Sequence, residues 1–226
     1  MTSVSVSQRI THYVAALSED AFVAVRDVNG SRSAVESAFS RLAANGKLTR
    51  IRKGIYWKGT ITPLGISLPS VEKVALFLGG PGSGPAGVAA AHWLGLTSQI
   101  PSTYLTAVPG RAPAPWQQIK FTQRPIGRLL TDMSPSEVAV LEVLRSGPAV
   151  VETDWEQLGA VVVQLAENEH VRTDVLHDAA NDEPHRGTRT RWIELCRSQP
   201  ELMPKSRTCD YQTTKSRLNP AVRDLG

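Results

Sequence analysis

The residues best suited to chemistry are concentrated between Ser31 and Lys58, where hydroxyl, guanidinium and ammonium groups recur at regular spacings. On a helix over residues 32–44, the face opposite the apolar stripe would present Arg32, Ser33, Glu36, Ser37, Ser40 and Arg41. Arginine reads guanine bidentately in the DNA major groove, and serine reaches several base edges. The segment is therefore predicted to be a DNA-reading helix.

The next segment, residues 47–58, predicts a basic β-hairpin. Apolar β-formers flank a Lys53-Gly54 turn, and glycine gives a tight turn its backbone freedom. Its cations would bind phosphates and release counterions, which gives affinity without sequence information. The predicted phosphate contacts are Arg50, Arg52, Lys53 and Lys58. Two alternatives stay open: a solvated edge whose lysines discourage aggregation, and a helix-turn-helix unit that docks a protein partner.

The elements before this pair would position it. Residues 6–17 carry apolar side chains at helical spacing, residues 21–25 predict a short strand, and residues 26–30 predict one helical turn. Helix, strand, short helix, capped helix and basic hairpin is the order of a winged helix-turn-helix. A DNA-binding domain is therefore expected over residues 1–60.

The caps of the 32–44 helix are also predicted. Ser31 or Ser33 can cap its start, and Ser33 with Glu36 three residues later suggests a capping box. Asn45-Gly46 would end it, since both tolerate the left-handed conformation.

Charge divides the chain into three blocks. The 226 residues carry a net charge of +4, but residues 1–59 hold nine Lys/Arg and four Asp/Glu, residues 60–185 hold seven and thirteen, and residues 186–226 hold nine and four. The acidic block would repel DNA phosphate, and its residues Glu152, Asp154, Glu156, Glu167 and Glu169 suit contact with a basic protein partner. Two functional surfaces are therefore expected.

The rest of the chain predicts a linker at 61–69, a mixed, mainly helical domain with a small β-hairpin at 70–197, and a basic extended or disordered tail at 198–226. The whole is expected to be an α+β protein. The two strands of that hairpin are placed at 103–108 and 117–122. Helices are placed at 71–78, 85–96, 134–145, 154–166, 169–180 and 187–197.

Three other patterns could carry chemistry. Residues 82–87 match GxGxxG, but neither an acidic residue about twenty positions later nor a Lys-Ser/Thr pair follows, so a simple loop entering a helix is favoured. His170, Asp174, His177 and Asp178 have the spacing of one helix face and suit either a metal or a solvated face. No nucleophile motif occurs, so no catalytic residue, cofactor or metal is assigned and an enzyme is not expected.

Composition excludes collagen, coiled coil and wholesale disorder, with 41% hydrophobic and 20% charged residues. Cys196 and Cys209 fit reduced thiols in a cytoplasm, and no signal peptide is expected. Residues 74–96 are uncharged, but the glycines and prolines between Gly79 and Gly87 would break a membrane helix, so a buried core segment is favoured.

Residues 31–56 closely resemble the N-terminal winged helix of AbiEi-type antitoxins, in which a helix ending in -xxRLxxxGxL- precedes -xRxxxGxY- in the wing. Residues 89–110, with a Leu94-Gly95-Leu96 turn, resemble the segment that follows. The resemblance covers about residues 5–145.

This resemblance implies a transcriptional autorepressor that binds inverted repeats in its own promoter and neutralises a nucleotidyltransferase-type toxin. It carries over to Arg32, Ser33, Ser37 and Arg41 on the helix and to Arg50, Arg52 and Lys53 on the wing. The expected partners are thus double-stranded DNA and a toxin, with no membrane.

Overall fold

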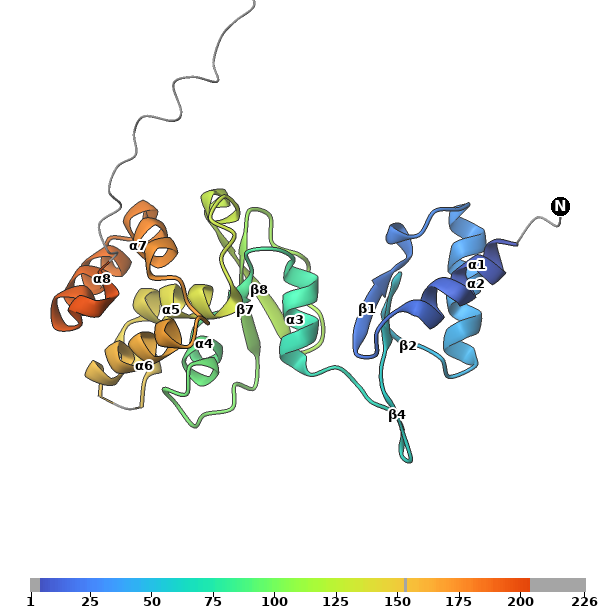
Figure 1. Cartoon of the computed structure of the whole chain (residues 1–226), viewed down its shortest axis with the longest axis horizontal. Helices are drawn as coiled ribbons and strands as arrows, with labels where there is room; N and C mark the ends of the chain where they lie inside the picture. The colour runs from blue at the N-terminus through green and yellow to red at the C-terminus, as the bar shows by residue number, and fades with distance from the viewer. Residues whose placement is uncertain (1–4, 153, 204–226) are drawn as a thin grey trace, which may run out of the picture.

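Apolar side chains alternate along short β segments and recur three to four residues apart on the helices, and they fold the chain into mixed α+β structure. The computed structural model describes residues 5–152 and 154–203. Two groups of elements follow each other along the chain (Figure 1). We call residues 5–58 the amino-terminal unit and residues 70–203 the carboxy-terminal unit.

The amino-terminal unit has its elements where the sequence predicts them. A three-stranded antiparallel sheet has the order β1-β3-β2. Its elements are α1 (Val6–Ala16), β1 (Ala21–Ala24), η1 (Val25–Asp27), α2 (Arg32–Ala44), β2 (Thr49–Arg52) and β3 (Ile55–Lys58). The predicted helix over 32–44 and the hairpin turning at Gly54, whose φ is +77°, are confirmed.

The two faces of this sheet pack against different parts of the protein. Val23 and its partner Tyr56 face α1 and α2, where Phe39 stacks on Tyr56 at 5.1 Å between ring centroids. Phe22 and its partner Trp57 face the other way, because side chains alternate along a strand. Figure 1 shows α1 and α2 on the side of the sheet away from α3.

The predicted capping box of α2 is wrong. The helix begins at Arg32, so Ser31 is the N-cap residue and makes no side-chain cap hydrogen bond. Ser33 is then the second helical residue, where its hydroxyl cannot close a box with Glu36. Glu36 instead pairs with Arg32, one turn earlier. The predicted end at Asn45-Gly46 is confirmed, with Gly46 at φ +65°.

The predicted linker folds into a two-stranded hairpin of β4 (Ile61–Thr62) and β5 (Gly65–Ile66), with Leu64 fully exposed at its tip. The base of the hairpin is tied to the sheet, because Trp57 Nε1 donates to the Ser67 carbonyl oxygen at 2.9 Å. In Figure 1 this hairpin, labelled β4, projects away from both units.

The carboxy-terminal unit combines helices with a three-stranded sheet of order β6-β7-β8. Its elements are α3 (Val71–Gly79), β6 (Gly84–Pro85), α4 (Val88–Trp93), β7 (Tyr104–Pro109), β8 (Ile119–Arg124), η2 (Ile126–Leu129), α5 (Pro135–Ser146), η3 (Pro148–Val150), α6 (Glu156–Glu167), α7 (Thr173–Asp182), α8 (Arg186–Ser198) and η4 (Pro200–Leu202). Figure 1 shows β7 and β8 between α3 on one side and α4 and α5 on the other.

The small β-hairpin expected in this unit is wrong. The two predicted strands form, as β7 and β8, but they pair in parallel, with Tyr104 opposite Ile119 and Pro109 opposite Arg124. The proline-rich connection therefore returns along the sheet before β8 begins. β6 pairs antiparallel with the other edge of β7 and includes Pro85, which was predicted to start a helix. Consequently α4 starts only at Val88, after Gly87 at φ +58°.

Helix α5 is the centre of this unit, and every residue from Glu137 to Leu144 is buried. Ser134 caps it with a complete capping box, and Pro135 occupies its first turn. Gly84 lets β6 approach α5 closely, since a Cβ there would lie 2.5 Å from Val138 Cβ.

An aromatic cluster joins the two units. Phe22 of β1 stacks on Phe77 of α3, with ring centroids 4.3 Å apart and planes 18° apart, and contacts Trp57 at 4.7 Å. The ammonium of Lys73 lies 5.5 Å from the Trp57 ring centroid and 3.8 Å from Asp20 Oδ2. The sheet face away from α1 and α2 is thus covered by α3.

Of the predicted tail, residues 200–202 form η4 with Leu202 buried, while residues 204–226, including Cys209, lie outside the described residues. Cys196 is a free thiol, and burial raises its pKa to about 11. No helix in the described ranges is long and apolar enough to span a membrane.

Candidate nucleic-acid interface

The polar face of α2 is open to solvent. Val35, Phe39 and Leu42 point into the core, which leaves the predicted base-reading side chains on the outside. The exposed residues are Arg32, Ser33, Ser37, Ser40 and Arg41. Arg41 Nε donates to the Ser37 carbonyl oxygen at 3.3 Å, so its guanidinium lies along the helix.

A β-bulge in the hairpin separates two arginines that the sequence places together. In the β2–β3 register Arg50 pairs with Tyr56 and Arg52 pairs with Ile55, so one extra residue, Ile51, is inserted between them. Side chains two residues apart on a regular strand lie on the same face, but a bulge between them breaks this alternation. Arg52 lines a cavity beside α2, whereas Arg50 lines a different cavity beside the carboxy-terminal unit.

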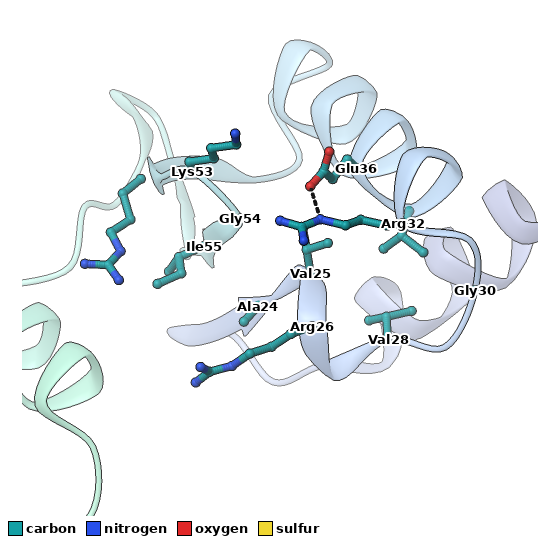
Figure 2. A pocket seen from close by; sticks show the side chains of 12 residues that line it. Ala24, Val25, Arg26, Val28, Gly30, Arg32, Glu36, Lys53, Gly54 and Ile55 are labelled. Carbon is teal, nitrogen blue, oxygen red and sulfur yellow. Dashed lines mark hydrogen bonds and ion pairs between the residues drawn. The ribbon is translucent and has the colours of Figure 1, made fainter. Parts of the chain in front are cut away.

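The cavity beside α2 is basic. Its volume is about 540 Å³, and it lies between η1, the first turn of α2 and the hairpin turn. Figure 2 shows Arg26, Arg32 and Lys53 around it, each from a different segment. With Arg52, four cations line the cavity against one carboxylate, Glu36. Such a concave basic surface attracts phosphate oxygens.

Arg26 was not predicted as a site residue. Its side chain is 85% exposed, and its carboxylate neighbour Asp27 lies 3.6 Å away. It follows β1 directly, in a segment that the sequence marks only as a helical turn. Its place opposite Lys53 depends on the pairing of β1 with β3, which no local pattern reveals.

Lys58 is placed away from the other hairpin cations. Its ammonium donates to the carbonyl oxygens of Ala15, at 3.1 Å, and Leu17. A lysine at that position satisfies carbonyl groups at the C-terminal end of α1 and complements the helix dipole. The ammonium of Lys58, which was predicted to contact a phosphate, therefore forms its hydrogen bonds within the protein.

The patterns in the carboxy-terminal unit assemble no metal site among the described residues. Helix α7 begins only at Thr173, because Glu169 has a φ of +58° and the chain turns there, so His170 does not share the helix face with His177. His177 Nδ1 accepts a hydrogen bond from Trp192 Nε1 at 3.3 Å. The predicted helix over 169–180 is thus wrong at its start.

Residues 82–87 form a loop that includes β6 and leads into α4, which is the favoured interpretation of the GxGxxG match. Gly84 is required by the close approach of α5 rather than by a ligand.

Three of the acidic residues in the middle block are buried in ion pairs. Glu142 accepts from Arg124 Nη2 at 2.6 Å and from Arg128 Nη1 at 2.8 Å, and Arg128 Nε also donates to Glu183 at 2.6 Å. Burial raises the pKa of Glu142, but the hydrogen bonds and charges of both arginines outweigh it, so this pKa lies below its ordinary value.

Glu137 is the third buried acid. Arg172 binds it through Nε and Nη2, both at 2.8 Å. Burial opposes these bonds, and the net effect is still a lowered pKa of Glu137. These residues hold α5 to its neighbours and are not available to a partner.

The other acidic residues of this block keep its surface acidic. Apart from the buried acids and their four arginine partners, residues 60–185 hold ten acidic and three basic residues. The exposed carboxylates predicted for a partner lie at the two ends of α6 or just outside them: Glu152, Asp154, Glu156, Glu167 and Glu169. Glu152 also accepts from the Ser98 backbone N–H at 2.8 Å, which lowers its pKa.

No family model matches the chain, and no curated protein matches it. Among solved structures, the crystal structure of RV2827C protein from Mycobacterium tuberculosis is similar, with 16% sequence identity and a TM-score of 0.47 over 85% of this chain and 76% of that chain. A likeness this distant does not establish a family.

Proposed function

We propose that this chain is a sequence-specific DNA-binding transcriptional repressor whose amino-terminal unit acts as a winged helix-turn-helix. The observation that carries the proposal is the basic cavity between the first turn of α2 and the hairpin turn, lined by Arg26, Arg32, Arg52 and Lys53. Together with the exposed polar face of α2, it supports one continuous surface for a duplex.

In this proposal α2 enters the major groove and the hairpin lies along the phosphate backbone. Arg32 and Arg41 read base edges, with Ser33, Ser37 and Ser40 as shorter contacts. Arg26, Arg52 and Lys53 bind phosphates and set the position of α2. Arg50, an exposed residue of β2, adds charge, and Lys58 is omitted because its ammonium is hydrogen-bonded at the end of α1.

Gel-shift titration against the DNA upstream of the gene tests this function. We expect sequence-selective binding, with an affinity several orders of magnitude above that for unrelated DNA at the same salt concentration. Equal affinity for both DNAs would contradict a specific repressor. No binding to either would instead favour the alternative, in which the unit docks a protein partner without touching DNA.

We also propose that the repressor controls its own promoter at inverted repeats and serves as the antitoxin of a nucleotidyltransferase-type toxin. This half rests on the resemblance to AbiEi-type antitoxins and on the acidic groups at the two ends of α6. An enzyme that handles nucleotides or RNA presents a basic cleft, and exposed carboxylates complement it.

The adjacent reading frame tests the antitoxin half. We expect it to encode a nucleotidyltransferase whose purified product forms a complex with this chain. The complex should weaken when Glu167 and Glu169 are both changed to Gln, while Glu36→Gln, on the amino-terminal unit, should leave it unchanged. A neighbouring product that is not a nucleotidyltransferase, or that does not bind, would contradict this half alone.

A further inference from the structure

The β4–β5 hairpin exposes apolar side chains that the proposed DNA contacts do not use. Residues 59–70, which include it, contain no charged residue. Leu64 at its tip is fully exposed, while Ile61 and Leu68 are 80% and 73% exposed. Apolar side chains that cluster on a protein surface mark an interaction site. The hairpin is therefore suited to contact another protein chain.

A cavity of about 240 Å³, which we call the base cavity, lies where this hairpin leaves the sheet. One wall is α1, where Thr11, Val14 and Ala15 have the i, i+3, i+4 spacing of a single helix face. Leu42 of α2 and Ile61 of β4 complete its apolar lining. The base cavity and the hairpin thus form one continuous apolar surface.

The charged residues that line the base cavity do not favour an ion there. Glu19 and Lys47 are exposed and opposite in charge. The third, Lys58, donates through its ammonium to carbonyl oxygens at the end of α1. Neither sign of charge dominates, so an uncharged apolar group suits this cavity best.

The tip of the hairpin is such a group. A cavity of roughly 150 Å³ holds a benzene ring, so the base cavity has room for the Leu64 side chain together with Pro63. Leu64 is fully exposed, so no described part of its own copy covers it, and the hairpin projects away from both units (Figure 1). A second copy of the chain supplies a cavity that matches this tip.

We infer that two copies of this chain form a dimer by exchanging hairpin tips, with Leu64 of each copy seated in the base cavity of the other. Such a contact uses the same surface on both copies and closes after two of them. The hairpin follows β3 at the end opposite the Gly54 turn, so the dimer leaves the basic cavity beside α2 open (Figure 1). The dimer therefore forms whether or not the chain binds DNA.

Sedimentation equilibrium of the full chain without DNA tests the exchange. We expect a reversible dimer with a dissociation constant on the order of micromolar. Leu64→Asp should raise that constant at least about a hundredfold, because each dimer loses two buried leucine side chains. Leu130→Asp is the matched control, since Leu130 is 90% exposed on the carboxy-terminal unit, and it should leave the dimer unchanged.

Blocking the cavity separates an exchange from general apolar association. Ala15→Trp places a large side chain in the base cavity from an exposed position of α1 and should also prevent the dimer. His12→Trp, an exposed position of α1 outside the cavity, should not. A mixture of Leu64→Asp and Ala15→Trp should regain a weak dimer, because one intact tip still meets one intact cavity.

Three results would overturn the exchange. The first is an unaltered chain that stays monomeric at its highest soluble concentration. The second is a dimer that Leu64→Asp leaves as stable as Leu130→Asp does. The third is a mixture of Leu64→Asp and Ala15→Trp that associates no better than either variant alone.

Discussion

Arg32 Nε donates to Glu36 Oε1 at 2.9 Å, one turn apart on the exposed face of α2. The Arg32 side chain is 83% exposed, so this pair is worth only about 0.3–0.5 kcal/mol. The pair orients the guanidinium across the mouth of the basic cavity without locking it there (Figure 2). Arg32 can therefore exchange a carboxylate for a guanine edge at little cost.

Selectivity is the first prediction. Arg32→Ala should weaken the free energy of binding to the best operator by about 1–3 kcal/mol, because a bidentate contact to guanine is lost. It should also relax the discrimination between bases at one position of the operator. Competition titrations with operators altered one base pair at a time measure it. Arg9→Ala, an exposed cation on α1, is the control. An equal loss of affinity for all operator variants would show that Arg32 contacts a phosphate instead.

Lys58 should behave differently from the other hairpin cations. Lys58→Ala removes hydrogen bonds to the Ala15 and Leu17 carbonyl oxygens, so we expect about 1 kcal/mol of lost stability in urea unfolding. DNA affinity should change little. If the Lys58→Ala protein kept normal stability but bound DNA weakly, Lys58 would instead be a phosphate contact.

The pH dependence of stability follows from Glu142 and Glu137. Their pKa values in the folded protein lie below the unfolded value of about 4.3, so both add stability above that pH and lose it as pH falls through the folded pKa. The free energy of unfolding should thus stay level from neutral pH to about pH 5 and decline as pH falls below about 4.3. Urea titrations across this range measure it.

Glu142→Gln tests the same network directly. It should cost about 3–5 kcal/mol at pH 7, because Arg124 and Arg128 lose the charge that neutralises them, and it should flatten the acid decline. The exposed Glu156→Gln is the control and should stay within about 0.5 kcal/mol. Equal effects of the two changes would refute the network's role.

The stack of Phe22 on Phe77 should couple the two units. A double-mutant cycle with Phe22→Leu and Phe77→Leu should give a coupling energy of about 0.5–1.5 kcal/mol, beyond the area each ring buries. Chemical unfolding of the four proteins supplies the cycle. Strict additivity would mean that the rings do not pack together in solution.

Local patterns were enough to predict helix α2, the turn of the following hairpin and the start of α5. A few neighbouring residues determine each of these features, so they can be recognised in the sequence. They are the apolar stripe of α2, the turn at Gly54 and the cap at Ser134. The capping box at Ser33 failed because the helix starts one residue after Ser31, a shift that local spacing does not decide.

Features that depend on pairing between distant segments were not predictable. The bulge at Ile51 comes from the register of β2 on β3, and it divides Arg50 from Arg52 although they are two residues apart. The parallel pairing of β7 with β8 likewise depends on the path of the loop between them. Glu142 was counted only as one of the thirteen acids of residues 60–185, and its ion pairs were not predictable because its arginine partners lie 14 and 18 residues earlier.

The central claim is that the basic cavity beside α2 binds the phosphates of an operator, and the salt dependence of DNA affinity tests it most directly. The slope of log affinity against log salt concentration should be shallower by about 2 for Arg52→Ala/Lys53→Ala than for the unaltered chain, with all sequences weakened alike. Lys58→Ala should keep the full slope. An unchanged slope in the double variant would contradict the account.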